Sequence, residues 1–172
     1  DINKSIHYFS LSANQNNPHA QYMLGFFYFR GLYFKKNIIK AIDYFNQSSS
    51  NGLIDGHFAV GFFYHEGKHV KRDIKKSIHH YKEASTFDNQ YAKNNLGVIY
   101  RYGCGDEIQP NCGLSMDYFE EAIRRFKDKV SMYNLSHIYI YEDKNKSRLK
   151  KSIEFLIEST KQKFSPSNEL LC

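Results

Sequence analysis

The chain has 172 residues, about the length of one domain, and its 41% hydrophobic and 24% charged residues are ordinary for a protein that folds around a core. No apolar stretch approaches the ~20 residues that cross a bilayer, and 3 Pro and 10 Gly are too few for a disordered or collagen-like chain. The net charge of +6 favours encounters with acidic partners without identifying one.

An internal repeat organises the chain. The segment Leu24–Tyr28 recurs as Val60–Tyr64 and Leu96–Tyr100 at a spacing of 36 residues, and a degenerate copy occupies Leu135–Tyr139. The second position is Gly in the first three copies and Ser136 in the fourth. Self-similarity at such a period is typical of helical-repeat proteins, and a mid-helix Gly is explained if a paired helix approaches closely there.

A second block recurs in phase with the first and has apolar residues at helical spacing. Asn37 and Asp73 stand before it as predicted helix N-caps, while Gly31 and Gly67 stand where the preceding helix is predicted to end. Each repeat is therefore predicted to be a helical hairpin.

The predicted elements begin with an orphan second helix at 3–14, which indicates a fragment of a longer chain. Four predicted repeats follow in chain order, each a single hairpin, and a tail comes last at 165–172. The repeats are repeat one (18–54, helices 18–29 and 37–50), repeat two (55–89, helices 55–66 and 73–86), repeat three (90–128, helices 90–102 and 112–126) and degenerate repeat four (129–164, helices 129–141 and 147–162). We expect one solenoid over residues 1–172.

The repeat also carries a family resemblance. The pattern A-x3-L-G-x2-Y at 20–28 resembles the first helix of a tetratricopeptide repeat, and Y-x2-G-x2-V-x2-D at 64–73, with the longer period, is similar to the Sel-one-like repeat (SLR) family. The resemblance implies an all-α, right-handed solenoid of antiparallel hairpins. It also implies a non-enzymatic adaptor or scaffold that needs no cofactor or metal.

Proteins that resemble this family include bacterial secreted or periplasmic proteins and the luminal subunit of a ubiquitin-ligase complex for endoplasmic-reticulum-associated degradation. On that resemblance we predict a protein-binding adaptor of the secretory pathway, acting in endoplasmic-reticulum quality control as a subunit of a membrane complex. The alternative is a cytosolic or bacterial scaffold with a different partner.

In tetratricopeptide-like arrays the first helices line the concave surface, and three positions around the repeat Leu face the groove. In this chain those positions form what we term the first-helix row: Tyr22, Phe26, Phe29, Phe58, Phe62, His65, Asn94, Val98, Arg101, Tyr133, His137 and Ile140. Large aromatic side chains suit an extended peptide or a partner helix. The alternative is that they fill the gaps between adjacent hairpins, as solenoids require.

The segment 65–69 matches H-E-x-x-H, in which two His residues on one helical face bind zinc in hydrolases. The repeat phase argues against that function, because Gly67 is predicted to end the helix between His65 and His69. A zinc hydrolase using His65, Glu66 and His69 is therefore the least favoured hypothesis.

Cys104 and Cys112 lie at the end of one predicted helix and the start of the next. A disulfide between them would fasten the hairpin across its loop, and some secreted SLR proteins look similar. We predict this bridge, with two thiols in a cytosolic protein as the alternative.

Four sites match the N-glycosylation pattern, at Asn3, Asn46, Asn134 and Asn145. Asn145 is the best candidate because it lies in a polar loop, whereas Asn134 is predicted inside a helix. A used site would support the secretory context.

Basic residues gather near the loops, at Lys35–Lys36, Lys71–Arg72, Arg124–Arg125 and Lys144–Lys151. A solenoid would stack them along one edge, where acidic protein, lipid headgroups or nucleic acid could bind. Acidic residues are interspersed and no nucleic-acid-binding motif accompanies them, so we predict a solvated edge and no nucleic-acid partner.

Overall fold

The computed structural model describes residues 2–142 and 148–161, which form helices and loops without any strand. The all-α repeat fold predicted from the sequence is confirmed. The chain divides into two compact units, Asp1–Asn89 and Gln90–Cys172, where the sequence analysis expected one solenoid. The boundary falls between the predicted second and third repeats, so no hairpin is cut. None of the described helices is both long and apolar enough to cross a membrane.

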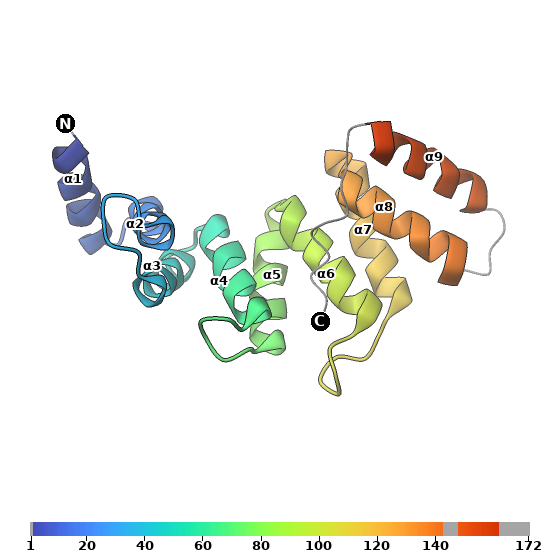
Figure 1. Cartoon of the computed structure of the whole chain (residues 1–172), viewed down its shortest axis with the longest axis horizontal. Coiled ribbons are helices and arrows are strands. Elements are labelled where there is room, and N and C mark those ends of the chain that lie inside the picture. The colour runs from blue at the N-terminus through green and yellow to red at the C-terminus, as the bar shows by residue number, and fades with distance from the viewer. Residues whose placement is uncertain (1, 143–147, 162–172) are drawn as a thin grey trace. The chain divides into compact units, whose positions relative to one another are not determined.

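Unit 1 consists of α1 (Ile2–Asn14), α2 (Pro18–Arg30), α3 (Ile38–Ser50), α4 (Ile54–Glu66) and α5 (Ile74–Thr86). Helix α2 pairs with α3 and α4 pairs with α5, each as an antiparallel hairpin (Figure 1). Helix α1 lies against α2, and α3 lies against α4. The predicted ends of these helices are correct to within one residue.

Unit 2 consists of α6 (Gln90–Tyr102), α7 (Cys112–Phe126), α8 (Lys129–His137), the π-helix η1 (Ile138–Glu142) and α9 (Leu149–Lys161). Helices α6 and α7 form one hairpin and α8 and α9 another, with α7 against α8. The predicted helix 129–141 is thus an α-helix whose last turn widens into a π-helix.

Side-chain caps set the start of most hairpin helices. The Asn37 carboxamide oxygen accepts a hydrogen bond from the Lys40 N–H at 3.0 Å, and the Asp73 carboxylate accepts one from the Lys76 N–H at 2.8 Å. At the other end, Gly31 and Gly67 adopt the left-handed conformation, with φ of 70° and 66°. Both predicted N-caps and both predicted helix ends are confirmed.

Each of the first three hairpins has the same internal contact, in which an aromatic ring of the second helix covers the glycine of the first. We term these pairs the hairpin frame: Gly25–Phe45, Gly61–Tyr81 and Gly97–Phe119. A Cβ on Gly97 would lie 2.6 Å from the Phe119 ring, closer than real Cβ atoms approach their neighbours. The predicted packing role of these glycines is therefore confirmed.

The loop between the two helices of a hairpin is closed at its ends by one backbone hydrogen bond. The N–H of the N-cap residue donates to the carbonyl of the tyrosine near the end of the preceding helix. These bonds are Asn37 to Tyr28 at 3.0 Å, Asp73 to Tyr64 at 3.1 Å and Asn111 to Tyr100 at 2.6 Å. The spacing between the helices therefore does not depend on the conformation in the middle of the loop.

Candidate functional site

The first-helix row of unit 1 is carried by α2 and α4, which contact each other. Its aromatic members are all half-buried: Tyr22, Phe26, Phe29, Phe58 and Phe62. Tyr22, Phe26 and Phe29 pack against a cluster of buried side chains. Phe58 and Phe62 lie beside the buried rings of Tyr81 and Phe63. The Tyr22 ring centroid lies 5.3 Å from that of Phe45, and that of Phe29 lies 5.7 Å from that of Phe63. The rings therefore fill the space beside the core and still leave part of their surface to solvent.

His65 departs from the rest of the row. Its side chain is only 4% exposed and lies edge-on to the buried Tyr81 ring. The chain turns back after Gly67, which brings Arg72 near, and burial followed by the Arg72 charge lowers the pKa of His65. The imidazole therefore belongs to the core at the end of α4, and its contact with a partner stays a prediction.

The H-E-x-x-H segment does not form a helical zinc motif. Helix α4 ends at Glu66, the left-handed Gly67 turns the chain, and His69 is exposed in the following loop. His65 and His69 therefore do not share a helical face. Within the described residues, no group of three or more His, Cys, Asp or Glu side chains is placed to hold a metal ion.

The first-helix row of unit 2, on the contacting helices α6 and α8, is more polar. The Asn94 side-chain oxygen accepts hydrogen bonds from Ser131 at 3.3 Å and Asn134 at 3.5 Å, so it joins the two helices. The Arg101 guanidinium lies over the Tyr102 ring. On α8 the half-buried Tyr133 and His137 rings lie tilted against each other, with centroids 4.6 Å apart, and Ile140 in η1 is exposed. Val98 packs against the core.

The structure has no disulfide between Cys104 and Cys112. Cys104 is buried, and its backbone N–H donates to the Ile108 carbonyl at 2.8 Å, which folds the loop back on itself. Backbone hydrogen bonds shape this loop, and the bridge stays a prediction. The glycosylation candidate Asn145 lies outside the described residues.

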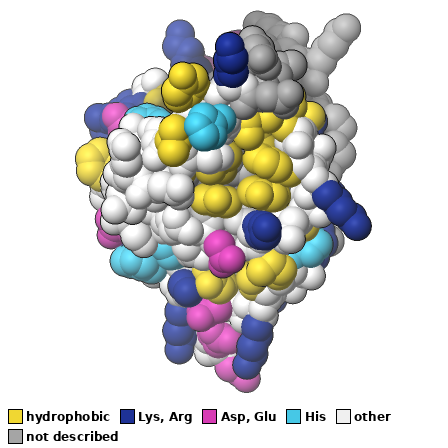
Figure 2. Space-filling view, turned by 90° about the vertical axis from the view of Figure 1, so that its left-hand side faces the viewer, with side chains coloured by type: hydrophobic (Ala, Val, Ile, Leu, Met, Phe, Trp, Pro, Cys, Tyr) yellow, Lys and Arg dark blue, Asp and Glu magenta, His cyan; other side chains and the backbone are white. Residues whose placement is uncertain are grey.

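Three surface features were missed by the sequence analysis. A cleft of about 580 Å³ between α7 and α9 is lined by Asp117, Glu120, Glu121, Ile123, Arg124, Lys151 and Phe155. Another, of about 470 Å³, lies at the α1 end of unit 1 beside the exposed Tyr8, where hydrophobic side chains gather on the surface (Figure 2). Helix α9 exposes Leu149, Ile153 and Ile157 at helical spacing. The helical spacing of these three α9 residues is a signal that the sequence contains. The two clefts depend on which helices pack together, and no local pattern gives that.

These features define a class: an all-α helical-repeat protein whose first helices present a partly exposed row of side chains. Residues 1–17, 18–53, 54–86 and 90–125 match the model of the Sel1 repeat, which covers more than half of the chain. The chain therefore belongs to the Sel1 repeat family, whose members mediate protein–protein interactions. The predicted degenerate fourth repeat, at 129–164, lies outside the matched residues, although α8 and α9 form a hairpin.

Solved structures support the same fold. A Sel1 repeat protein from Oxalobacter formigenes is 26% identical, with a TM-score of 0.79 over 94% of this chain and 65% of that one. A protective antigen of uropathogenic Escherichia coli with an SLR fold is 18% identical, with a TM-score of 0.84 over 92% of this chain and 33% of that one. Cysteine rich protein B of Helicobacter pylori is 24% identical, with a TM-score of 0.55 over 76% of this chain and 92% of that one.

This chain thus spans less than two thirds of the first two of these proteins. No curated protein matches it.

Proposed function

We propose that this chain is a non-enzymatic scaffold that binds a protein partner, as an extended peptide or a helix, along the first-helix row of unit 1. One observation carries the proposal: five aromatic side chains from the contacting helices α2 and α4 remain partly exposed although each lies beside buried side chains. Aromatic rings anchored in this way give a partner large contact area at little cost in side-chain entropy.

The chemistry of the row favours protein over nucleic acid. Its unit 1 members are aromatic and carry no positive charge, whereas nucleic-acid binding depends on cations that contact phosphates. The basic pairs Lys35–Lys36 and Lys71–Arg72 lie exposed in the loops between helices, outside the row. They are placed to affect the association rate of an acidic partner and not the place where that partner binds.

The cellular context is part of the proposal. The endoplasmic-reticulum quality-control role rested on the family resemblance, a Cys104–Cys112 bridge and a glycan at Asn145. Asn145 lies outside the described residues. The secretory scaffold stays our favoured proposal, with a cytosolic or bacterial scaffold as the alternative. Alkylation of natively purified protein without reductant, followed by peptide mass mapping, tests this context. A peptide linked through Cys104 and Cys112 would support the secretory scaffold, and two separately alkylated thiols would favour the alternative.

Panning of a displayed random-peptide library on the whole chain tests the binding row. Phe26→Ala and Phe62→Ala are expected to weaken the selected peptides at least about tenfold, since each removes one aromatic anchor. Ile39→Ala is the matched control, because Ile39 is 58% exposed on the second helix α3. Unchanged far-UV circular dichroism shows that each variant is folded. Peptides that bind all three variants like the parent chain would contradict the row as the interface.

A further inference from the structure

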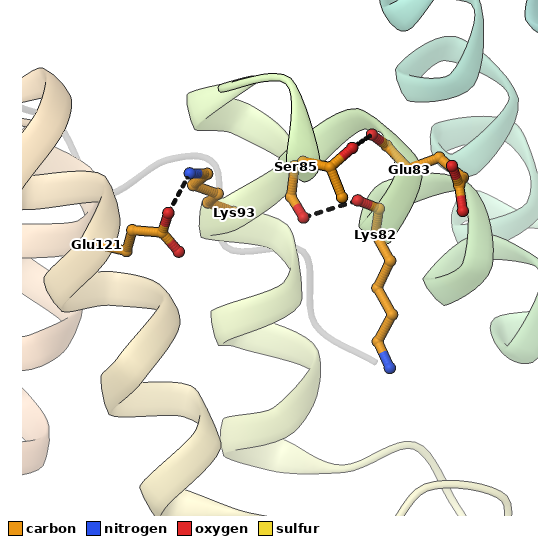
Figure 3. Close-up of polar contacts among 6 residues, drawn as sticks. Lys82, Glu83, Ser85, Lys93 and Glu121 are labelled. Atoms are coloured by element: carbon orange, nitrogen blue, oxygen red, sulfur yellow. Dashed lines mark hydrogen bonds and ion pairs between the residues drawn. The ribbon is translucent and has the colours of Figure 1, made fainter. Parts of the chain in front are cut away.

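Each of the first three hairpins has a polar contact from its first helix to its second helix or, in the first hairpin, to the C-cap residue of the second helix. It starts from the residue three positions before Leu24, Val60 or Leu96, and we term each contact a polar rung. The rungs are Gln21 with Asn51 (2.9 Å), His57 with His80 (3.1 Å) and Lys93 with Glu121 (2.6 Å, Figure 3). In the first and third rungs a donor meets an acceptor of fixed type. The second rung differs, because two imidazole rings face each other.

The geometry of the second rung resembles that of two ligands on one metal ion. The Nδ1 atoms of His57 and His80 are hydrogen-bonded to each other at 3.1 Å, with the ring planes inclined at 43°. With metal–nitrogen bonds of about 2.0–2.1 Å, two nitrogen atoms at this separation subtend about 100° at the metal. That angle is close to the tetrahedral value. An ion can take the place of the Nδ1 proton in this hydrogen bond if the donating ring carries its proton on Nε2 instead, which leaves both Nδ1 lone pairs for the ion.

One of the two rings also has a backbone partner, because the Ser49 backbone hydrogen-bonds to His57. A backbone partner of this kind is what usually orients a metal-bound His.

The charges around the pair also leave room for a cation. Glu83 lies one helical turn after His80 on α5 and contributes negative charge beside His57. The Lys76 ammonium instead donates to the Tyr64 hydroxyl at 2.7 Å and lies over the Tyr64 ring. Both His57 and His80 are half-buried, so water can reach the open side of an ion held between them.

We propose that His57 and His80 bind a divalent transition-metal ion of the imidazole-preferring class, with Zn²⁺ as the representative, through their two Nδ1 atoms. Water completes the coordination, since the described residues place no third ligand at the pair. The ion would link α4 to α5 and thereby tighten the second hairpin. The proposal goes beyond the scaffold function and does not depend on the first-helix row.

A titration of the whole chain with ZnCl₂ tests the site through the thermal midpoint of unfolding. The midpoint is expected to rise with Zn²⁺ for the parent chain, because an ion that binds only the folded state stabilises it. His57→Gln and His80→Gln are expected to lose the rise, with Zn²⁺ affinity reduced at least about tenfold. His79→Gln is the matched control: His79 is exposed on the same helix, next to His80, and its loss is expected to leave the rise unchanged.

A second measurement does not depend on any variant folding. In ¹⁵N spectra of the parent chain, Zn²⁺ is expected to shift the Nδ1 resonances of His57 and His80 more than those of the other His residues. Equal midpoint rises in the parent chain and His80→Gln would overturn the proposal, as would Nδ1 resonances of His57 and His80 that stay in place at saturating Zn²⁺.

Discussion

Unit 1 and unit 2 place different chemistry on the same helical positions. The first-helix row is aromatic on α2 and α4, whereas on α6 and α8 it includes Asn94, Arg101 and His137. The hairpin frame beneath it is alike, with Gly61 under Tyr81 in one unit and Gly97 under Phe119 in the other. The difference indicates that the hairpin frame determines the fold, whereas the side chains of the first-helix row can differ between units and determine which partner binds.

The largest expected effect separates frame from row. Phe119 is completely buried, so Phe119→Ala is expected to lower the free energy of unfolding by about 3–5 kcal/mol. Phe62→Ala removes a half-buried ring from the row and is expected to cost only about 1–2 kcal/mol. Urea denaturation followed by circular dichroism measures both. Equal losses would mean that the row is as much a part of the core as the frame.

The next effect concerns the polar rungs. Glu121→Gln leaves the Lys93 ammonium, whose side chain is 2% exposed, opposite a neutral amide. The loss of this charge-assisted hydrogen bond is expected to lower the free energy of unfolding by about 1.5–3 kcal/mol. Glu154→Gln on the exposed side of α9 serves as the control and is expected to change it little. A negligible effect of Glu121→Gln would show that the rung adds nothing to the stability of unit 2.

A smaller effect tests the close approach within the frame. Gly97→Ala forces the Phe119 ring to move, at a cost of about 1–2 kcal/mol after the better helix propensity of Ala is counted. Gly113→Ala is the matched control, because the nearest atom to its added Cβ lies 3.6 Å away, and we expect it to stabilise α7 slightly. Thermal midpoints that fall equally for both variants would point to backbone effects instead of the ring contact.

The smallest expected effect is a pH dependence confined to unit 1. The pKa of His80 is about 4 in the folded chain and that of His57 is also lowered, while an ordinary His titrates near 6.5. The unfolded chain therefore binds more protons between pH 6.5 and 4, so stability is full above this window and falls as the pH drops through it. Allowing for solvent screening, we expect about 1 kcal/mol, measured as the difference between the parent chain and His80→Gln in urea.

Much of the architecture could be predicted because its signals are local. Asn37 and Asp73 cap the helices that follow them, and Gly31 and Gly67 end the helices that precede them, through contacts a few residues away. The repeat phase then assigned a packing role to the mid-helix glycines. Such features need no knowledge of distant segments.

The candidate site was harder, because it depends on contacts between helices. The row offsets named His65 as a surface residue, yet the loop that returns after Gly67 brings Arg72 back toward the imidazole at the end of α4. The His57–His80 rung joins residues 23 positions apart, and no pattern within either helix predicts it. The repeat spacing predicted on which face of a helix each residue lies, but not which residues of other segments cover that face.

The closing hydrogen bond of each loop has a practical consequence for labelling the protein. In the third hairpin Asn111 follows Tyr100 by eleven positions, compared with nine between Tyr64 and Asp73, and the same closure forms around the longer segment. The middle of that segment, at Asp106 and Glu107, is exposed to solvent. An affinity tag or fluorophore-binding peptide inserted between Asp106 and Glu107 would therefore lengthen an exposed part of the loop. The hydrogen bond from Asn111 to Tyr100 would still hold α6 and α7 in register.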